Sequence, residues 1–155
     1  IQANDLIGRK ISYEGGRSIN ILLEEMESFL TDLNKHTDEK SIASIASEFS
    51  QALGSLKESV DWLVTTFPLD KRKVFAGSVS FLKLMGIVSG GWLSAKSALS
   101  AHKILSEGKG DEEFLSAKIV TAQYYAEHIL PTSLALKKEI IIGSGSTLAL
   151  LNSQF

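Results

Sequence analysis

The segment Val79-Ser-Phe-Leu-Lys-Leu-Met-Gly-Ile-Val-Ser-Gly-Gly-Trp-Leu-Ser-Ala95 is the most apolar part of the chain. Its large apolar residues fall on more than one side of a helical projection. A helix that is apolar around much of its circumference is typical of the central member of a bundle. The segment is short and is interrupted by Lys83 and by glycines, so we expect a buried helix and no membrane span.

Apolar residues recur at helical spacing along nearly the whole chain, and the sequence shows no convincing pair of strands. We expect helices at about 2–13, 18–35, 41–66, 70–107, 112–130 and 131–142, and a last helical turn within 146–151. The pattern predicts an all-α fold, an antiparallel helical bundle of four to six helices with one long central helix at 70–107.

Helix boundaries are marked by glycine, proline and capping residues. Breaks are expected at Glu14-Gly15-Gly16, Pro68 and Gly108-Lys109-Gly110. Pro131 suits the first turn of the sixth helix. Glycines within the long helix are expected to allow close approach of a neighbour or a local kink: Gly86, Gly90 and Gly91. Side-chain caps are expected from Ser18, from Thr37 or Asp38, and from Asp111.

The composition is that of an ordinary globular domain. The 155 residues include 16 basic and 18 acidic ones, for a net charge of −2, and no cysteine. The length fits one domain, or one domain with a short extension. No basic stripe stands out, which disfavours a nucleic-acid binder. The lack of cysteine excludes a disulfide scaffold and thiolate metal sites, and we expect a cytoplasmic location.

Few residues of the chain have the type and spacing that indicate catalysis or metal binding. The three histidines, His36, His102 and His128, lack the spacing of a helical metal site, so no metal is expected. The acidic run Glu24-Glu25-Glu27 is interpreted as a solvated helix face, since nothing separates the pKa values of its carboxylates. The glycine-rich segments match no phosphate-binding signature. These patterns alone predict no catalytic residue.

The first ten residues, Ile1-Gln-Ala-Asn-Asp-Leu-Ile-Gly-Arg-Lys10, resemble a segment of the acyl-CoA dehydrogenases. In that family the pattern Tyr-Glu-Gly-Thr-x-Gly-Ile-Gln-Ala-x-Asp-Leu-x-Gly-Arg-Lys spans the end of the catalytic loop. The resemblance implies that Gln2 and Asn4 lie near the flavin dinucleotide. It also implies a chain that starts just after the catalytic glutamate. Glu14 does not replace that base, because it follows the matching block instead of preceding it.

A second block resembles the additional C-terminal helical domain of a bacterial subgroup of this family, which includes enzymes acting on methylthiopropanoyl-CoA. The subgroup pattern is Lys-x-x-x-Ala-x-Phe/Tyr-Phe/Tyr-x-x-x-x-Leu-Pro. The residues that match it are Lys118, Ala122, Tyr124, Tyr125, Leu130 and Pro131. This resemblance implies two parts, residues 1–14 ending the helical catalytic domain and residues 15–155 forming the additional helical-bundle domain.

The resemblance implies a parent enzyme that performs FAD-dependent α,β-dehydrogenation of an acyl-CoA thioester. The chain would be its C-terminal fragment, inactive alone, without retained FAD, and serving packing and assembly. Expected partners are the remainder of the dehydrogenase, the acyl-CoA bound through it, and a second copy in a homo-oligomer. No nucleic-acid or membrane partner is expected. The alternative is a free-standing helical protein–protein interaction module.

Overall fold

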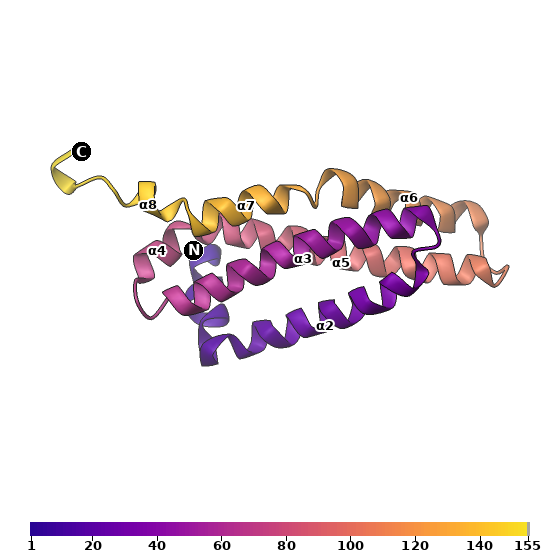
Figure 1. Cartoon of the computed structure of the whole chain (residues 1–155), viewed down its shortest axis with the longest axis horizontal. Helices are drawn as coiled ribbons and strands as arrows, with labels where there is room; N and C mark the ends of the chain where they lie inside the picture. Colours follow the sequence, from indigo (N-terminus) through magenta and orange to yellow (C-terminus); the bar gives the residue numbers. More distant parts are fainter. Residues whose placement is uncertain (155) are drawn as a thin grey trace.

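The computed structural model describes residues 1–154, and every regular secondary-structure element in that range is a helix or a helical turn (Figure 1). A short α-helix, a π-helical turn and a 3₁₀ turn come first, α1 (Gln2–Asp5), Leu6–Ile11 and Tyr13–Gly16. The longer helices are α2 (Arg17–Leu33), α3 (Lys40–Thr66), α5 (Ser78–Ser106), α6 (Glu112–His128) and α7 (Thr132–Ile141). Short elements complete the chain: 3₁₀ turns at Asn34–His36 and Asn152–Gln154, α4 (Lys71–Ala76) and α8 (Ser144–Thr147).

The helices run up and down to form one elongated bundle, which confirms the predicted all-α antiparallel fold (Figure 1). Helix α5 packs against α2, α3, α6 and α7, and α3 packs against α2, α6 and α7. Helices α6 and α7 follow one another along the same side of the bundle. Both chain ends, with α1, α4 and α8, lie at one end of the molecule (Figure 1).

The core is built from side chains that α3 and α5 direct at each other and at their neighbours. Phe49, Leu56, Phe81, Leu84 and Val88 are completely buried. Burying each such side chain stabilises the fold by roughly 1.5–3 kcal/mol. Within residues 1–154, α5 is also the helix whose length and mean hydropathy would suffice for a membrane span. The central helix of a bundle has the same two properties.

The predicted long helix at 70–107 is wrong in one respect, because Gly77 divides it into α4 and α5. Gly77 has φ −91° and ψ 5°, outside helical geometry, and lies against the backbone of α7. A Cβ at Gly77 would be 3.2 Å from the Cα of Ile140. The chain therefore turns where α7 crosses closely. Asp70 caps the separate α4, accepting a hydrogen bond from the Arg72 amide at 3.0 Å.

The other boundaries follow local chemistry that the sequence indicated only in part. The break at 14–16 is confirmed, since Glu14, Gly15 and Gly16 all have positive φ. Asp111 caps α6 as predicted, accepting from the Phe114 amide at 2.9 Å.

Four boundary predictions are wrong. Gly16, and not Ser18, stands at the α2 N-cap. Glu39 replaces Thr37 and Asp38 as the cap of α3, accepting from the Ser41 amide. Pro131 is the N-cap of α7 and not its first helical residue, and the last turn lies at 144–147 instead of 146–151.

Two of the three glycines within α5 allow close contact, as predicted. Tyr125 lies directly over Gly90, and its hydroxyl donates to the carbonyl of Ile87 at 3.1 Å. A Cβ at Gly91 would be 2.6 Å from Leu130 Cδ2. Gly86 differs, because nothing lies within 4 Å of the position that its Cβ would occupy.

Gly90→Ala and Gly86→Ala are therefore expected to change stability in opposite directions. An alanine at 90 overlaps the Tyr125 hydroxyl and should lower the free energy of unfolding by about 1–3 kcal/mol. An alanine at 86 meets open space and should raise it by about 0.5–1 kcal/mol through helix propensity. Urea denaturation followed by circular dichroism measures both, and equal effects of the two substitutions would contradict the packing described.

Candidate functional site

The two predicted cofactor-contacting residues lie on α1 but face different surroundings. Ala3 is buried beneath them, whereas Gln2 and Asn4 are exposed. Asn4 lines an open hollow with a cavity volume of about 460 Å³. The other lining residues come from the same N-terminal segment and from α4: Ile1, Asp5, Gly8, Arg9 and Phe75. Gln2 is not among them, so the structure brings only one of the two residues to this hollow.

An ion pair dominates the electrostatics of the hollow. The Arg9 guanidinium donates to both carboxylate oxygens of Asp5, with Nη2 3.0 Å from Oδ2. This hydrogen bond lowers the pKa of Asp5, and the pKa of Arg9 is correspondingly raised. Both groups are charged at neutral pH, so Asp5 is not prepared to take a proton from a substrate.

The apolar wall of the hollow comes from α4, which sequence reasoning did not associate with the N-terminal segment. Phe75 approaches Gly8 so closely that a Cβ there would be 3.3 Å from the ring. The Phe75 ring packs edge-on against Phe67 at 6.0 Å, and the Lys71 ammonium lies 5.2 Å from the Phe67 centroid. No periodicity indicated this contact, because it depends on the turn at Gly77.

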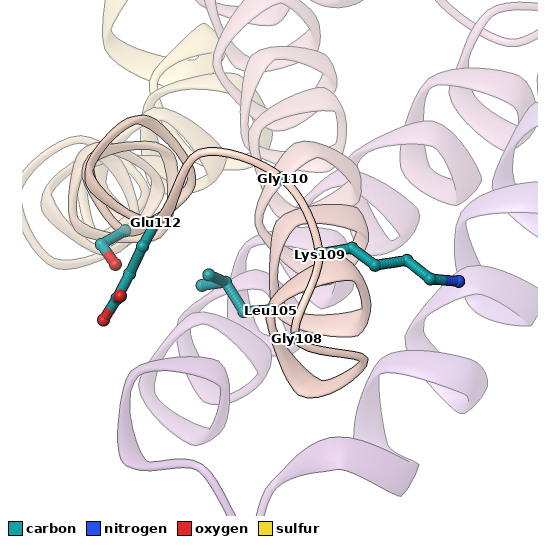
Figure 2. A pocket seen from close by; sticks show the side chains of 6 residues that line it. Leu105, Gly108, Lys109, Gly110 and Glu112 are labelled. Atoms are coloured by element: carbon teal, nitrogen blue, oxygen red, sulfur yellow. The ribbon is translucent and has the colours of Figure 1, made fainter.

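A second hollow lies at the turn between α5 and α6, and few of its lining residues have reactive side chains. Its walls include Leu105, Gly108 and Ser116. Figure 2 shows the Lys109 side chain pointing away from Glu112. Lys109 Nζ pairs instead with Glu107 Oε2 at 2.8 Å. The opposite charges at this turn therefore do not converge on a common point.

The histidines occupy two places in the fold. His36 and His102 meet edge to face with their ring centroids 5.8 Å apart, although they are distant in sequence. His128 stacks on Tyr124 at 4.4 Å. Among the described residues, no group of three or more histidine, aspartate and glutamate side chains is arranged to hold a metal. The sequence missed the His36–His102 contact because only the docking of α5 beside the α2–α3 turn creates it.

Each carboxylate whose pKa is shifted has a pKa below its usual value. The pKa of Asp32 is lowered by its hydrogen bond with Lys103 at 3.0 Å. Hydrogen bonds from Gln123 and Ser44 lower the pKa of Glu127. General-base catalysis on a weak carbon acid is favoured by a carboxylate with a raised pKa. Asp5, Asp32 and Glu127 therefore serve as surface hydrogen-bond acceptors and not as proton-transfer groups.

Comparison with known proteins identifies the family. Residues 22–150 match the family model described as acetyl-CoA dehydrogenase C-terminal like. The chain is also 38% identical over 130 residues to a 3-methylmercaptopropionyl-CoA dehydrogenase of Ruegeria pomeroyi. This match covers 84% of the chain but only 22% of the length of that relative. The chain therefore belongs to the acetyl-CoA dehydrogenase C-terminal-like family, as its second sequence block indicated.

Three of the six matching residues of that block pack at α5, whereas Lys118, Tyr124 and Pro131 are exposed. Ala122 and Leu130 are buried, with Leu130 against Gly91, and Tyr125 lies over Gly90. The buried half of the pattern that carries the family resemblance thus serves packing in this structure. The flavin-related block at residues 1–10 lies outside the range matched by the family model.

Removal of the guanidinium in Arg9→Gln should raise the pKa of Asp5. The hydrogen bond from Arg9 is the largest cause of the lowered value, so without it the carboxyl should titrate at higher pH. Because the pKa of Asp5 is depressed on folding, its stabilising effect exists above the unfolded value and is lost as the pH falls through the folded value. Carboxyl NMR titration measures the shift, and Asp32 serves as the internal control. An unchanged Asp5 titration would contradict the ion pair.

Proposed function

We propose that this chain is the helical C-terminal domain of an FAD-dependent acyl-CoA dehydrogenase and that it serves packing and assembly. The observation that carries the proposal is the family match over residues 22–150. The relative named as a CoA dehydrogenase adds support. The chain spans 22% of the length of that relative, so the reaction on the thioester is assigned to the whole enzyme and not to these residues.

The packing role is supported by what the described residues contain and what they lack. A continuous core joins all the longer helices. The pKa values of Asp5, Asp32 and Glu127 are all lowered, which makes these three carboxylates unsuited to α-proton abstraction. The catalytic glutamate belongs, in this proposal, to the preceding loop of the parent enzyme.

The residues present do not fit retention of FAD by the chain alone. Asn4 offers an amide at the rim of the hollow, but the nearby guanidinium of Arg9 is already paired with Asp5. Gln2 is exposed and lines no wall of that hollow. Two amides on one short helix could touch an edge of a dinucleotide but could not enclose it. We derive no reaction step through the flavin from these residues.

The proposed division assigns residues 1–14 to the end of the catalytic domain and residues 15–155 to the additional domain. Ile7 and Ile11 insert into the core of the bundle, which would fix the two parts rigidly to each other. Gly16 at φ 86°, with its Cβ position 2.9 Å from Val64, marks the change of direction. The parent is further proposed to be a cytoplasmic homo-oligomer.

The purified chain mixed with FAD and an acyl-CoA should show no substrate-dependent bleaching of the flavin. The reason is that, in this proposal, the base and most of the flavin site belong to the rest of the parent enzyme. The matched control is the polypeptide encoded by the complete reading frame, which should bleach under the same conditions. Absorbance near the flavin maximum is the readout.

Two outcomes would contradict the proposal. Bleaching by the chain alone would show that the chemistry lies within these residues. A complete reading frame that encodes no Tyr-Glu-Gly-Thr-type loop ahead of Ile1 would favour the free-standing interaction module.

A further inference from the structure

Helix α5 is apolar on nearly all sides, yet the bundle leaves much of it uncovered. Only 33% of its most apolar 18-residue window is buried. Helices α1, α2, α3, α6 and α7 pack against it but leave one face exposed. A soluble helix with this composition is normally covered on every side.

The open face is continuous along the helix. Val79, Leu82 and Leu93 are 64%, 38% and 60% exposed. With Gly86, they have the spacing i, i+3, i+7 and i+14, which places them on one side of an α-helix. Ser97 and Ser100 continue the same side and are exposed. We call this set of six residues the outer face of α5.

Small residues on the outer face suit a close-packed helix. Nothing lies within 4 Å of a Cβ placed at Gly86, so a partner backbone can approach there. Beside Leu93, a groove with a cavity volume of about 270 Å³ runs between α5 and α6. Its polar lining residues are Ser94, Ser97, Lys118 and Thr121. Three large apolar side chains separated by glycine and serine favour helix packing over insertion into lipid, which depends on larger apolar area.

The charged side chains of α5 itself have one sign, although Glu139 of α7 approaches the helix and accepts a hydrogen bond from Ser80 at 2.7 Å. No aspartate or glutamate occurs between Asp70 and Glu107. Lys83 is exposed beside the outer face, and Lys118 lines the adjoining groove. A second copy packed about a two-fold axis would bring its own Lys83 toward the same surface, which is unfavourable. A partner with carboxylates beside an apolar stripe is complementary.

We propose that the outer face of α5 docks an amphipathic helix of the dehydrogenase body, one with apolar side chains flanked by acidic residues. This inference rests on the proposed function. It is supported by the 22% coverage of the relative, which leaves most of that enzyme outside the matched region. The acidic helix covers Leu82 and Leu93 and places its carboxylates near Lys83 and Lys118.

The absence of cysteine allows a direct accessibility test. Ser97→Cys places a thiol on the outer face, and Ser28→Cys places a matched control on the exposed side of α2. Both substitutions are nearly isosteric and leave the core untouched. Maleimide alkylation of each site is followed by peptide mass spectrometry, in the chain alone and in the complete dehydrogenase that contains it.

In the chain alone both thiols should react at similar rates. In the complete enzyme the Ser97→Cys thiol should react at least about tenfold more slowly, while the Ser28→Cys rate should stay within about twofold. When Lys83→Glu is combined with Ser97→Cys, the complete enzyme should regain much of the maleimide reactivity lost at position 97. The reason is that the glutamate at position 83 repels the carboxylates of the docked helix.

Equal rates at position 97 in both samples would overturn the inference. Protection of the chain alone that appears only with phosphatidylglycerol-containing vesicles would overturn it in favour of a bilayer. Protection of the chain alone that rises with its own concentration would overturn it in favour of a second copy. Substrate-dependent flavin bleaching is recorded on the same complete enzyme. Bleaching without protection of the thiol at position 97 refutes only the docking of α5. No bleaching refutes the proposed function and, with it, the docking.

Discussion

The burial of α5 is the constraint on which the rest of this structure depends. The side of α5 that carries Phe81, Leu84 and Val88 is fully buried, and the other helices are arranged around that side. Gly90 and Gly91 let α6 approach until Tyr125 and Leu130 touch the α5 backbone. Gly77 ends the helix where α7 crosses. Each of these glycines lowers intrinsic helix stability and permits a contact that a larger residue would block.

The same constraint explains the packing role of Ala122, Tyr125 and Leu130, the buried or partly buried residues of the second sequence block. The matched residues of α6 fill the space created by small residues on α5, and the ion pairs with shifted pKa values lie on the surface. In the proposed function, the dehydrogenase uses this packed helical domain for assembly. One apolar face that the bundle leaves exposed lies on α5 itself, the helix that organises the interior.

The sequence predicted much of the fold because helical periodicity directly reports which residues face a core. Four of the expected segments, 18–35, 41–66, 112–130 and 131–142, correspond closely to observed helices, and Asp111 was identified as a cap from its residue type and position. The division at Gly77 could not be predicted, because it depends on contact with Ile140 far along the chain. The α1–α4 hollow and the His36–His102 contact were missed for the same reason. The roles of Gln2 and Asn4 rest on resemblance and remain predictions.

Native-state amide hydrogen exchange tests the central role of α5 most directly. If the bundle is organised around this helix, the slowest amides should be those from Phe81 to Ala98, together with the facing turns of α3, and they should open only with global unfolding. Helices α1 and α8, which contribute few buried residues, should exchange fastest. Exchange in the middle of α5 that is as fast as in α2, at a free energy well below that of global unfolding, would contradict this account.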